Sequence, residues 1–305
     1  MPTSPCPTVM AHGAAIPAIG LGTWPLAGEV CETAVATALD AGYRHIDTAA
    51  MYNNEAEVGR AIRASKVPRE QIFLTTKVWR DFIAEGDLQR SAEQSLKKLG
   101  LPYVDLLLIH WPNPSVPVAQ SIKALCDAKR RGLARHIGVS NHTVALLGEA
   151  LKAATEPLVC NQVEYHPHLD QTKVIAATRA ADMAVAAYCP LGRGDTGGVM
   201  SEPAIVEIAA VHKKSPAQVV LRWHLQQPGV VAIPKSATPK RIRENFNIFD
   251  FALTPAEMAR LSQLARSNGR IVQPAIAPQW DRVAIGPKCF AQPRRHLLRD
   301  FRRTW

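Results

Sequence analysis

Four polar residues near the carboxyl ends of three consecutive apolar runs have the types needed to protonate a reacting oxygen. Asp47 and Tyr52 lie in GYRHIDTAAMYNNEAEVG, Lys77 lies in IFLTTKVW, and His110 lies in VDLLLIHWP. An ammonium near a tyrosine stabilises the phenolate and lowers the pKa of the hydroxyl, while a carboxylate keeps the ammonium charged and aimed. We therefore expect Tyr52 to be an acid usable near neutral pH, with His110 orienting a carbonyl oxygen or sharing in the proton transfer.

The elements that must position these residues alternate between strands and helices. Eight apolar runs are typical of strands: 19–23, 45–49, 72–78, 104–110, 136–140, 158–165, 184–190 and 230–235. Helical periodicity falls between them, at 30–41, 87–99, 119–131, 143–154, 171–181 and 202–213. This alternation predicts an α/β protein with a (β/α)8 TIM barrel, and a doubly wound sheet is the competing fold.

Local signals refine this barrel. The segment VMAHGAAIP (9–17) reads as a hairpin around Gly13, and TPAEMARLSQLA (254–265) reads as an extra carboxyl-terminal helix. Candidate helix ends are Asp87 as a cap, Gly100 and Gly132 as terminators, and Ser215-Pro216 as a start. We find no linker that would divide residues 1–305, so we expect one domain with a core of about residues 8–281.

Three long motifs resemble those of the aldo-keto reductase family. They are IPAIGLGTW (16–24), GYRHIDTAAMYNNEAEVG (42–59) and IPKSATPKRIRENF (233–246), and the resemblance continues to about Asp281. The lack of long inserts and the ending NGRIVQPAIAPQWD are most similar to bacterial 2,5-diketo-D-gluconate reductases of the B type, which also act on methylglyoxal. Taken singly, the four polar residues also fit structural roles, namely a tyrosine at a helix end, a Lys–Asp strand pair and a hydrogen-bonded histidine. The motifs around them favour the catalytic interpretation.

A second group of residues has the chemistry of a phosphate site. Lys235, Ser236 and Arg241 offer two cations and a hydroxyl near the last strand and the amino end of the following helix, where an anion is favoured. The resemblance implies that these three residues hold the adenosine 2′-phosphate and that Asn245, beside Glu244, holds the adenine. The expected cofactor is therefore NADPH/NADP. The structural alternative is a surface basic cluster that caps a helix.

The opposite end of the cofactor has its own candidates. Ser140, Asn141 and Gln162 carry the hydrogen-bonding groups that a carboxamide requires, and Tyr188 offers a flat face for the nicotinamide ring or else a core aromatic. The family usually has an aromatic residue after GVSN, where this chain has His142.

A glycine-rich stretch, PLGRGDTGG, contains a literal G-x-G-x-x-G at Gly192, Gly194 and Gly197. A Rossmann fingerprint needs an immediate helix and an acidic residue about 20 positions later, and neither follows here. The resemblance implies a loop, including Leu191 and Gly192, that folds across the pyrophosphate.

Trp24, Trp79 and Trp111 each follow the end of an expected strand. Because barrel active sites form at that end, these rings are expected to wall a substrate pocket, although each alone also fits core packing.

Composition narrows the functional classes. The chain has 47% hydrophobic and 20% charged residues and a net charge of +10. After Asp281, seven basic residues and one acidic residue account for six of those charges, so the barrel has little excess charge for nucleic acid. We expect residues 282–305 to form a mobile or loosely docked tail, with an amphipathic helix through Leu297, Leu298 and Phe301 as the alternative.

Cysteines and apolar segments indicate the compartment. The six cysteines are scattered without a C-x-x-C pair or a zinc-like histidine spacing, which favours reduced thiols and no metal: Cys6, Cys31, Cys126, Cys160, Cys189 and Cys289. No apolar run approaches the roughly 18 residues of a membrane span, and no signal-peptide pattern opens the chain. We expect a cytoplasmic monomer.

These observations predict an NADPH-dependent reductase of aldehydes or ketones. Short apparent loops after the fourth and seventh strands favour small dicarbonyls or keto sugar acids, such as methylglyoxal or 2,5-diketo-D-gluconate, over steroids. A cofactor-bound barrel acting as a sensor or structural subunit is the alternative. A metal-dependent isomerase or hydrolase is disfavoured because no carboxylate and histidine cluster is expected at the strand ends.

Overall fold

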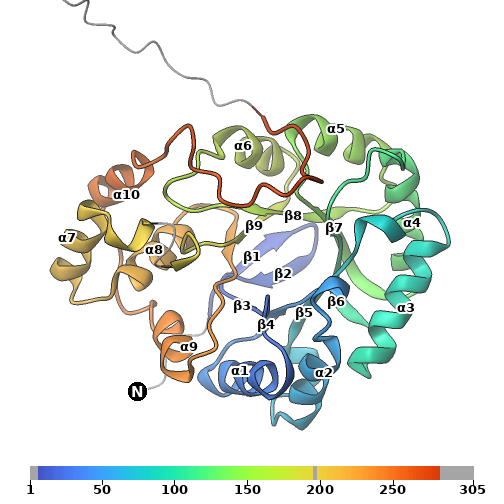
Figure 1. Cartoon of the computed structure of the whole chain (residues 1–305), viewed down its shortest axis with the longest axis horizontal. Helices are drawn as coiled ribbons and strands as arrows, with labels where there is room; N and C mark the ends of the chain where they lie inside the picture. Colours follow the sequence, from blue (N-terminus) through green and yellow to red (C-terminus); the bar gives the residue numbers. More distant parts are fainter. Residues whose placement is uncertain (1–5, 195–197, 282–305) are drawn as a thin grey trace, which may run out of the picture.

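The computed structural model of the protein describes residues 6–194 and 198–281. Its centre is a sheet of eight parallel strands in sequential order. These are β3 (Leu21–Gly22), β4 (His45–Asp47), β5 (Phe73–Val78), β6 (Val104–Ile109), β7 (Ala134–Ser140), β8 (Leu158–Glu164), β9 (Ala184–Tyr188) and β10 (Val230–Ala232). The sheet closes because Ile19 pairs with Ala232 and the Gly20 N–H donates to the Ala232 carbonyl at 2.9 Å. The predicted barrel is confirmed, and an open doubly wound sheet is excluded (Figure 1).

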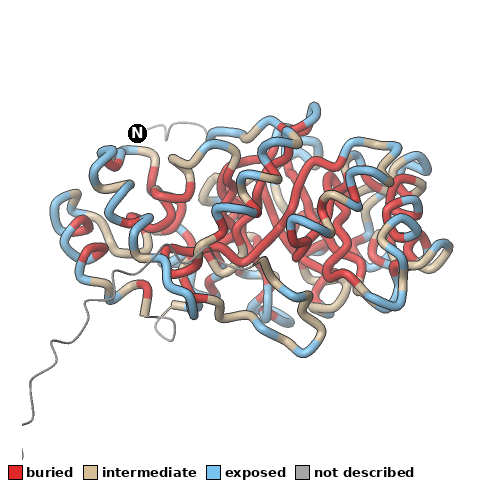
Figure 2. Tube along the Cα trace, turned by 90° about the horizontal axis from the view of Figure 1, so that it is seen from above, coloured by how far each residue is buried: buried red, intermediate tan, exposed pale blue. Residues whose placement is uncertain are grey.

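Helices surround the strands. They are α1 (Gly28–Ala41), α2 (Glu55–Ala64), α3 (Asp87–Leu99), α4 (Val118–Arg130), α5 (Val144–Ala153), α6 (Thr172–Ala180), α7 (Pro203–His212), α8 (Pro216–Leu225), α9 (Pro239–Phe246) and α10 (Pro255–Ser262). The strands are buried on both faces, as expected of a parallel sheet covered by helices, and exposure is concentrated on the outer helix surfaces (Figure 2). The extra helix expected near residues 254–265 is α10.

The amino-terminal hairpin is also confirmed. Strands β1 (Thr8–Ala11) and β2 (Ala14–Pro17) pair antiparallel around His12 and Gly13, which both have positive φ. Ala11, Ala14 and Ile16 pack with residues that begin barrel strands, such as Phe73. The hairpin therefore covers the amino-terminal end of the barrel and leaves the carboxyl ends of the strands for chemistry.

Most predicted helix ends are correct. Ser215 caps α8 in a reciprocal pair with Gln218, and Gly100 ends α3 in the left-handed conformation. The prediction that Asp87 caps α3 is wrong. The cap is Gly86, whose φ of 84° suits glycine and whose N–H donates to the Gln89 side chain at 2.8 Å, so Asp87 becomes the first helical residue.

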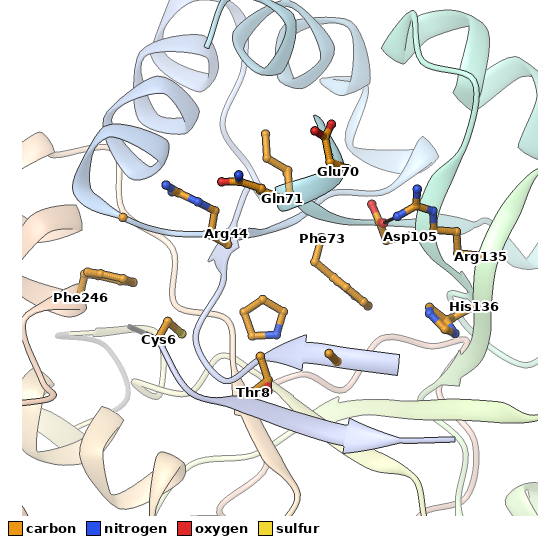
Figure 3. A pocket seen from close by; sticks show the side chains of 14 residues that line it. Cys6, Thr8, Arg44, Glu70, Gln71, Phe73, Asp105, Arg135, His136 and Phe246 are labelled. Atoms are coloured by element: carbon orange, nitrogen blue, oxygen red, sulfur yellow. Dashed lines mark hydrogen bonds and ion pairs between the residues drawn. The ribbon is translucent and has the colours of Figure 1, made fainter. Parts of the chain in front are cut away.

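A cavity of about 560 Å³ opens at the hairpin end of the barrel. Cys6 and Thr8 line it on the hairpin side, and Arg44, Phe73 and His136 line it on the barrel side (Figure 3). The lining includes none of the four polar residues of the predicted chemistry. Because chemistry in such barrels takes place at the opposite end, we do not assign this cavity to the active site.

Three further observations concern the described residues. None of their helices is long and apolar enough to cross a membrane. Cys6, Cys31, Cys126, Cys160 and Cys189 are free thiols. The predicted tail, residues 282–305, lies outside the described part of the chain.

Candidate active site

The barrel brings the four polar residues together at the carboxyl ends of its strands. Asp47 ends β4, Lys77 lies one residue before the end of β5, and His110 follows β6. Tyr52 ends a short 3-10 helix, η1 (Ala50–Tyr52), between β4 and α2. Since β4, β5 and β6 are parallel neighbours, their ends lie side by side.

The loop that carries Tyr52 is held by a residue that sequence reasoning did not single out. Asn53 takes the left-handed conformation that ends η1, and Asn54 is completely buried beneath it. The Asn54 amide donates to the carbonyls of Thr23 and Leu26 at 3.1 and 2.9 Å. The paired asparagines of MYNNE were the available signal, because asparagine favours both left-handed turns and side-chain bonds to backbone.

Lys77 is the hub of the group. Its fully buried ammonium donates to Asp47 Oδ1 at 2.5 Å, to the Thr48 carbonyl at 2.9 Å and to Tyr52 Oη at 3.1 Å. The second oxygen of Asp47 accepts from Gln162 Nε2 at 2.7 Å. Each charge therefore has hydrogen-bonded partners, which a buried ion pair requires.

The pKa directions correct one expectation. Burial works to lower the pKa of Lys77, but Asp47 and Tyr52 outweigh it and raise that pKa, so the ammonium stays charged. Burial raises the pKa of Tyr52, and Lys77 offsets only part of the rise. Lys77 lowers the pKa of Tyr52, as expected. The prediction that this pKa falls toward neutrality is wrong, because desolvation of the hydroxyl has the larger effect. Tyr52 therefore holds its proton at neutral pH.

His110 is a neutral neighbour of the hydroxyl. Burial holds its pKa well below the ordinary value, and the Lys77 ammonium lowers it further. Its ring meets the Tyr52 ring edge-on, with centroids 5.5 Å apart. A neutral imidazole here can donate a hydrogen bond to a carbonyl oxygen without adding a second positive charge.

The three tryptophans lie around this group in different ways. Trp24 is exposed, with its ring 5.1 Å from that of Tyr52, and Trp79 lies 5.4 Å from His110. Trp111 is buried and packs against Trp280, with centroids 6.1 Å apart. Trp24 and Trp79 therefore flank the reacting groups directly, whereas Trp111 contacts a residue that was not predicted.

The expected carboxamide site is buried and largely hydrogen-bonded internally. Asn141 donates to the His110 carbonyl at 2.9 Å and accepts from Tyr188 Oη at 2.8 Å. Ser140 Oγ donates to the Gln162 carbonyl at 2.9 Å. Because Gln162 gives an N–H to Asp47, its side-chain oxygen is the group left to receive a carboxamide N–H. Gln162 thus links the predicted carboxamide site to the Asp47–Lys77 pair, a contact that was not predicted from the sequence.

The expected phosphate site lies at the start of α9. Lys235 and Arg241 are exposed, and among the described residues no carboxylate pairs with either cation. Ser236 Oγ accepts from the Thr238 N–H at 3.0 Å at the entry to the helix. Two unpaired cations at a helix amino end without an acidic residue in its first turn fit a phosphate monoester.

Other proteins with this architecture identify the family. The model of the aldo/keto reductase family matches residues 18–266. Methylglyoxal reductase DkgB of Escherichia coli O157:H7 is 40% identical over 271 residues, which cover 88% of this chain and 100% of that protein. The chain belongs to the aldo/keto reductase family. It is therefore an oxidoreductase, and the resemblance inferred from three motifs is confirmed.

Two solved structures agree with this aldo/keto reductase in fold. One is a putative 2,5-diketo-D-gluconic acid reductase B, with 46% identity, a TM-score of 0.88, and coverage of 90% of this chain and 98% of that one. The other is a Bombyx mori aldo-keto reductase in complex with NADP, with 35% identity, a TM-score of 0.82, and coverage of 90% and 96%.

The remaining predicted cofactor residues of this aldo/keto reductase lie in the loop after β9, which holds Leu191 and Gly192, and on α9, which holds Glu244 and Asn245. Gly192 has positive φ, and a side chain there would collide with Val199, so only glycine fits. The helix α7 begins only at Pro203, which agrees with rejecting a Rossmann turn; Gly197 lies outside the described residues. Leu191 is partly buried, as is Glu244, and Asn245 is buried on α9.

A metal centre is not indicated in residues 6–194 and 198–281. No group of three or more histidine, cysteine, aspartate or glutamate side chains in this region is arranged to hold an ion.

Proposed function

We propose that this protein reduces small dicarbonyl compounds or keto sugar acids to alcohols with NADPH. The observation that carries the proposal is the buried Lys77 ammonium, which bonds at once to Asp47 and to Tyr52 Oη. A proton donor held against a charged ammonium at the mouth of a barrel suits a reaction in which a carbonyl oxygen gains negative charge.

The protein residues would handle the proton and the charge. When bound, NADPH supplies the hydride. Tyr52 Oη donates its proton to the carbonyl oxygen, since an alkoxide is a much stronger base than a phenolate. The Lys77 ammonium, 3.1 Å away, then stabilises the phenolate, and Asp47 keeps the ammonium in place. Neutral His110 orients the carbonyl oxygen between itself and Tyr52.

The preference for NADPH over NADH rests on Lys235, Ser236 and Arg241. Their two cations lack a carboxylate partner in the described part of the chain, and NADH has no 2′-phosphate to pair with them. The complex of the Bombyx mori relative with NADP is consistent with this preference.

The substrate class rests on the relatives and on the pocket. One relative is a methylglyoxal reductase, and one solved neighbour is a putative 2,5-diketo-D-gluconic acid reductase B. Trp24 and Trp79 supply aromatic walls for a short carbon chain, while Tyr52, Lys77 and His110 make the inner end polar.

The test compares kcat/KM for methylglyoxal, 2,5-diketo-D-gluconate and a steroid ketone, each with NADPH and with NADH. We expect kcat/KM to be higher for methylglyoxal and 2,5-diketo-D-gluconate than for the steroid ketone, and higher with NADPH than with NADH. A clear preference for the steroid would refute the substrate class alone. Absence of NADPH consumption with every carbonyl would refute the reductase proposal and favour a cofactor-bound sensor.

A further inference from the structure

Glu164 is a completely buried carboxylate at the end of β8 that takes no part in the proposed proton transfer. It accepts hydrogen bonds from His166 Nε2 at 3.0 Å, from the Ile271 N–H at 2.6 Å and from the Val272 N–H at 2.9 Å. Burial raises the pKa of Glu164, but these three bonds outweigh it and hold the pKa below its ordinary value. The carboxylate therefore stays charged and binds a segment more than 100 residues later in the chain.

That segment, residues 269–281, is fastened along the barrel mouth. It begins with a close approach, because a side chain at Gly269 would collide with the carbonyl of His168. Farther along, Arg80 after β5 donates to the Ile276 carbonyl at 3.4 Å, and Asp281 accepts from the N–H of Val144 after β7 at 3.0 Å. In Figure 1 the same segment is the red chain that follows α10 and passes the β8, α6 and α5 side of the barrel.

The fastened segment places Trp280 against Trp111, one of the three tryptophans predicted to line the pocket. The Trp280 ring lies 6.1 Å from Trp111, and its Nε1 donates to Gln273 Oε1 at 2.6 Å. The Arg270 guanidinium stacks on the same ring, 3.7 Å from its centroid, and an Arg270 nitrogen lies 3.6 Å from Glu164. One carboxylate thus anchors both the backbone and the cation on which Trp280 rests.

We propose that Glu164 is a positioning residue that sets Trp280 against Trp111 as a further, specificity-determining wall of the carbonyl pocket. This inference rests on the proposed function. The carboxylate acts through the segment at residues 270–272 and touches neither the substrate nor the proton donor.

The simpler interpretation is that Glu164 only stabilises the fold. The two interpretations differ in KM, because a merely stabilising residue leaves the pocket of the folded fraction unchanged. Glu257 supplies a matched control, since it also accepts from a backbone N–H, that of Thr254 at 2.7 Å, and from a histidine, His212 at 2.9 Å. It does so at the start of α10.

The experiment measures KM and kcat for methylglyoxal, and the Kd of NADPH, in Glu164→Gln, Trp280→Ala, the double variant and Glu257→Gln. Glutamine offers one acceptor oxygen and presents N–H groups to the remaining donors. We expect Glu164→Gln and Trp280→Ala each to raise KM about tenfold, with kcat and the Kd of NADPH changed less than about threefold. The KM of the double variant should be no higher than that of either single variant, because both changes remove the same wall. Trp280→Phe keeps an aromatic ring, so its KM should stay much closer to the wild-type value than that of Trp280→Ala. Glu257→Gln should leave KM unchanged.

An unchanged KM in folded Glu164→Gln, or a double variant with multiplied effects, would overturn the positioning role. If Glu164→Gln fails to fold, Arg270→Met keeps the carboxylate and its backbone bonds but removes the cation beneath Trp280. Its KM should rise about fivefold, and an unchanged KM would contradict the inference. Wild-type protein that consumed no NADPH with methylglyoxal, with 2,5-diketo-D-gluconate or with any other carbonyl would instead refute the proposed function.

Discussion

Replacing Lys77 by methionine should damage stability and turnover together, and a second substitution should separate the two. Methionine keeps the apolar stem but removes three hydrogen bonds, to Asp47, Tyr52 and the Thr48 carbonyl. The Asp47 carboxylate would then stay buried with Gln162 as its remaining partner. Breaking a buried ion pair in this way costs about 3–5 kcal/mol of unfolding free energy.

Adding Asp47→Asn to Lys77→Met removes the stranded charge while keeping an oxygen to accept from Gln162. We expect the double variant to recover about 2 kcal/mol or more of the loss, since a neutral pair avoids the cost of an uncompensated buried charge. Its turnover should stay as low as that of Lys77→Met, about 10²-fold or more below wild type, because both lack the ammonium that stabilises the phenolate.

Urea unfolding and NADPH oxidation with methylglyoxal, measured on the same preparations, check both parts. Asp87→Asn, at the half-buried first residue of α3, is a control for the loss of a carboxylate. The reasoning would be refuted by a double variant no more stable than Lys77→Met, or by recovery of turnover together with stability.

Three other predictions follow from separate regions. Arg241→Ala should weaken NADPH binding about tenfold or more, because a hydrogen bond to a charged group contributes about 1.5–3 kcal/mol. NADH binding should barely change, and fluorescence titration of both cofactors measures the two affinities. Burial lowers the pKa of His142 from 6.5 to about 4, so between those pH values the unfolded chain binds a proton that the folded protein does not, and stability falls as pH falls. His142→Phe should therefore reduce the stability difference between pH 7 and pH 4.5 by about 2 kcal/mol in urea unfolding; an unchanged difference would show that His142 does not contribute. Truncation after Asp281 should leave the melting temperature and turnover nearly unchanged, and a fall of many degrees would show that the tail is integral.

The barrel was predictable because its signals are local and repeated. Runs such as VDLLLI need helices on both faces, and their alternation with helical periods leaves few other topologies. Helix ends were harder to predict. The acidic Asp87 correctly indicated the first turn of α3, but the cap is Gly86, whose positive φ could not be read from the sequence.

The site was predictable where chemistry follows a strand end. Tyr52, Lys77 and Asp47 could be placed together because parallel neighbours end at one mouth. The direction of the pKa shift of Tyr52 was not predictable, because it depends on how deeply the hydroxyl is buried, and only the packed structure shows that. Contacts over long sequence separation, such as Gln162 with Asp47 or Glu164 with Ile271, have no local pattern to reveal them.

The central claim is that Tyr52 donates the proton in carbonyl reduction by NADPH. Its most direct test is single-turnover oxidation of bound NADPH by methylglyoxal in Tyr52→Phe, with NADPH affinity titrated in parallel. We predict a rate reduced about 10²-fold or more, where general acid catalysis contributes 10²–10⁴-fold, and an affinity within about threefold of wild type because the ring and the cofactor residues remain. A variant that kept more than about a tenth of the wild-type rate would contradict the assignment of Tyr52 as the proton donor.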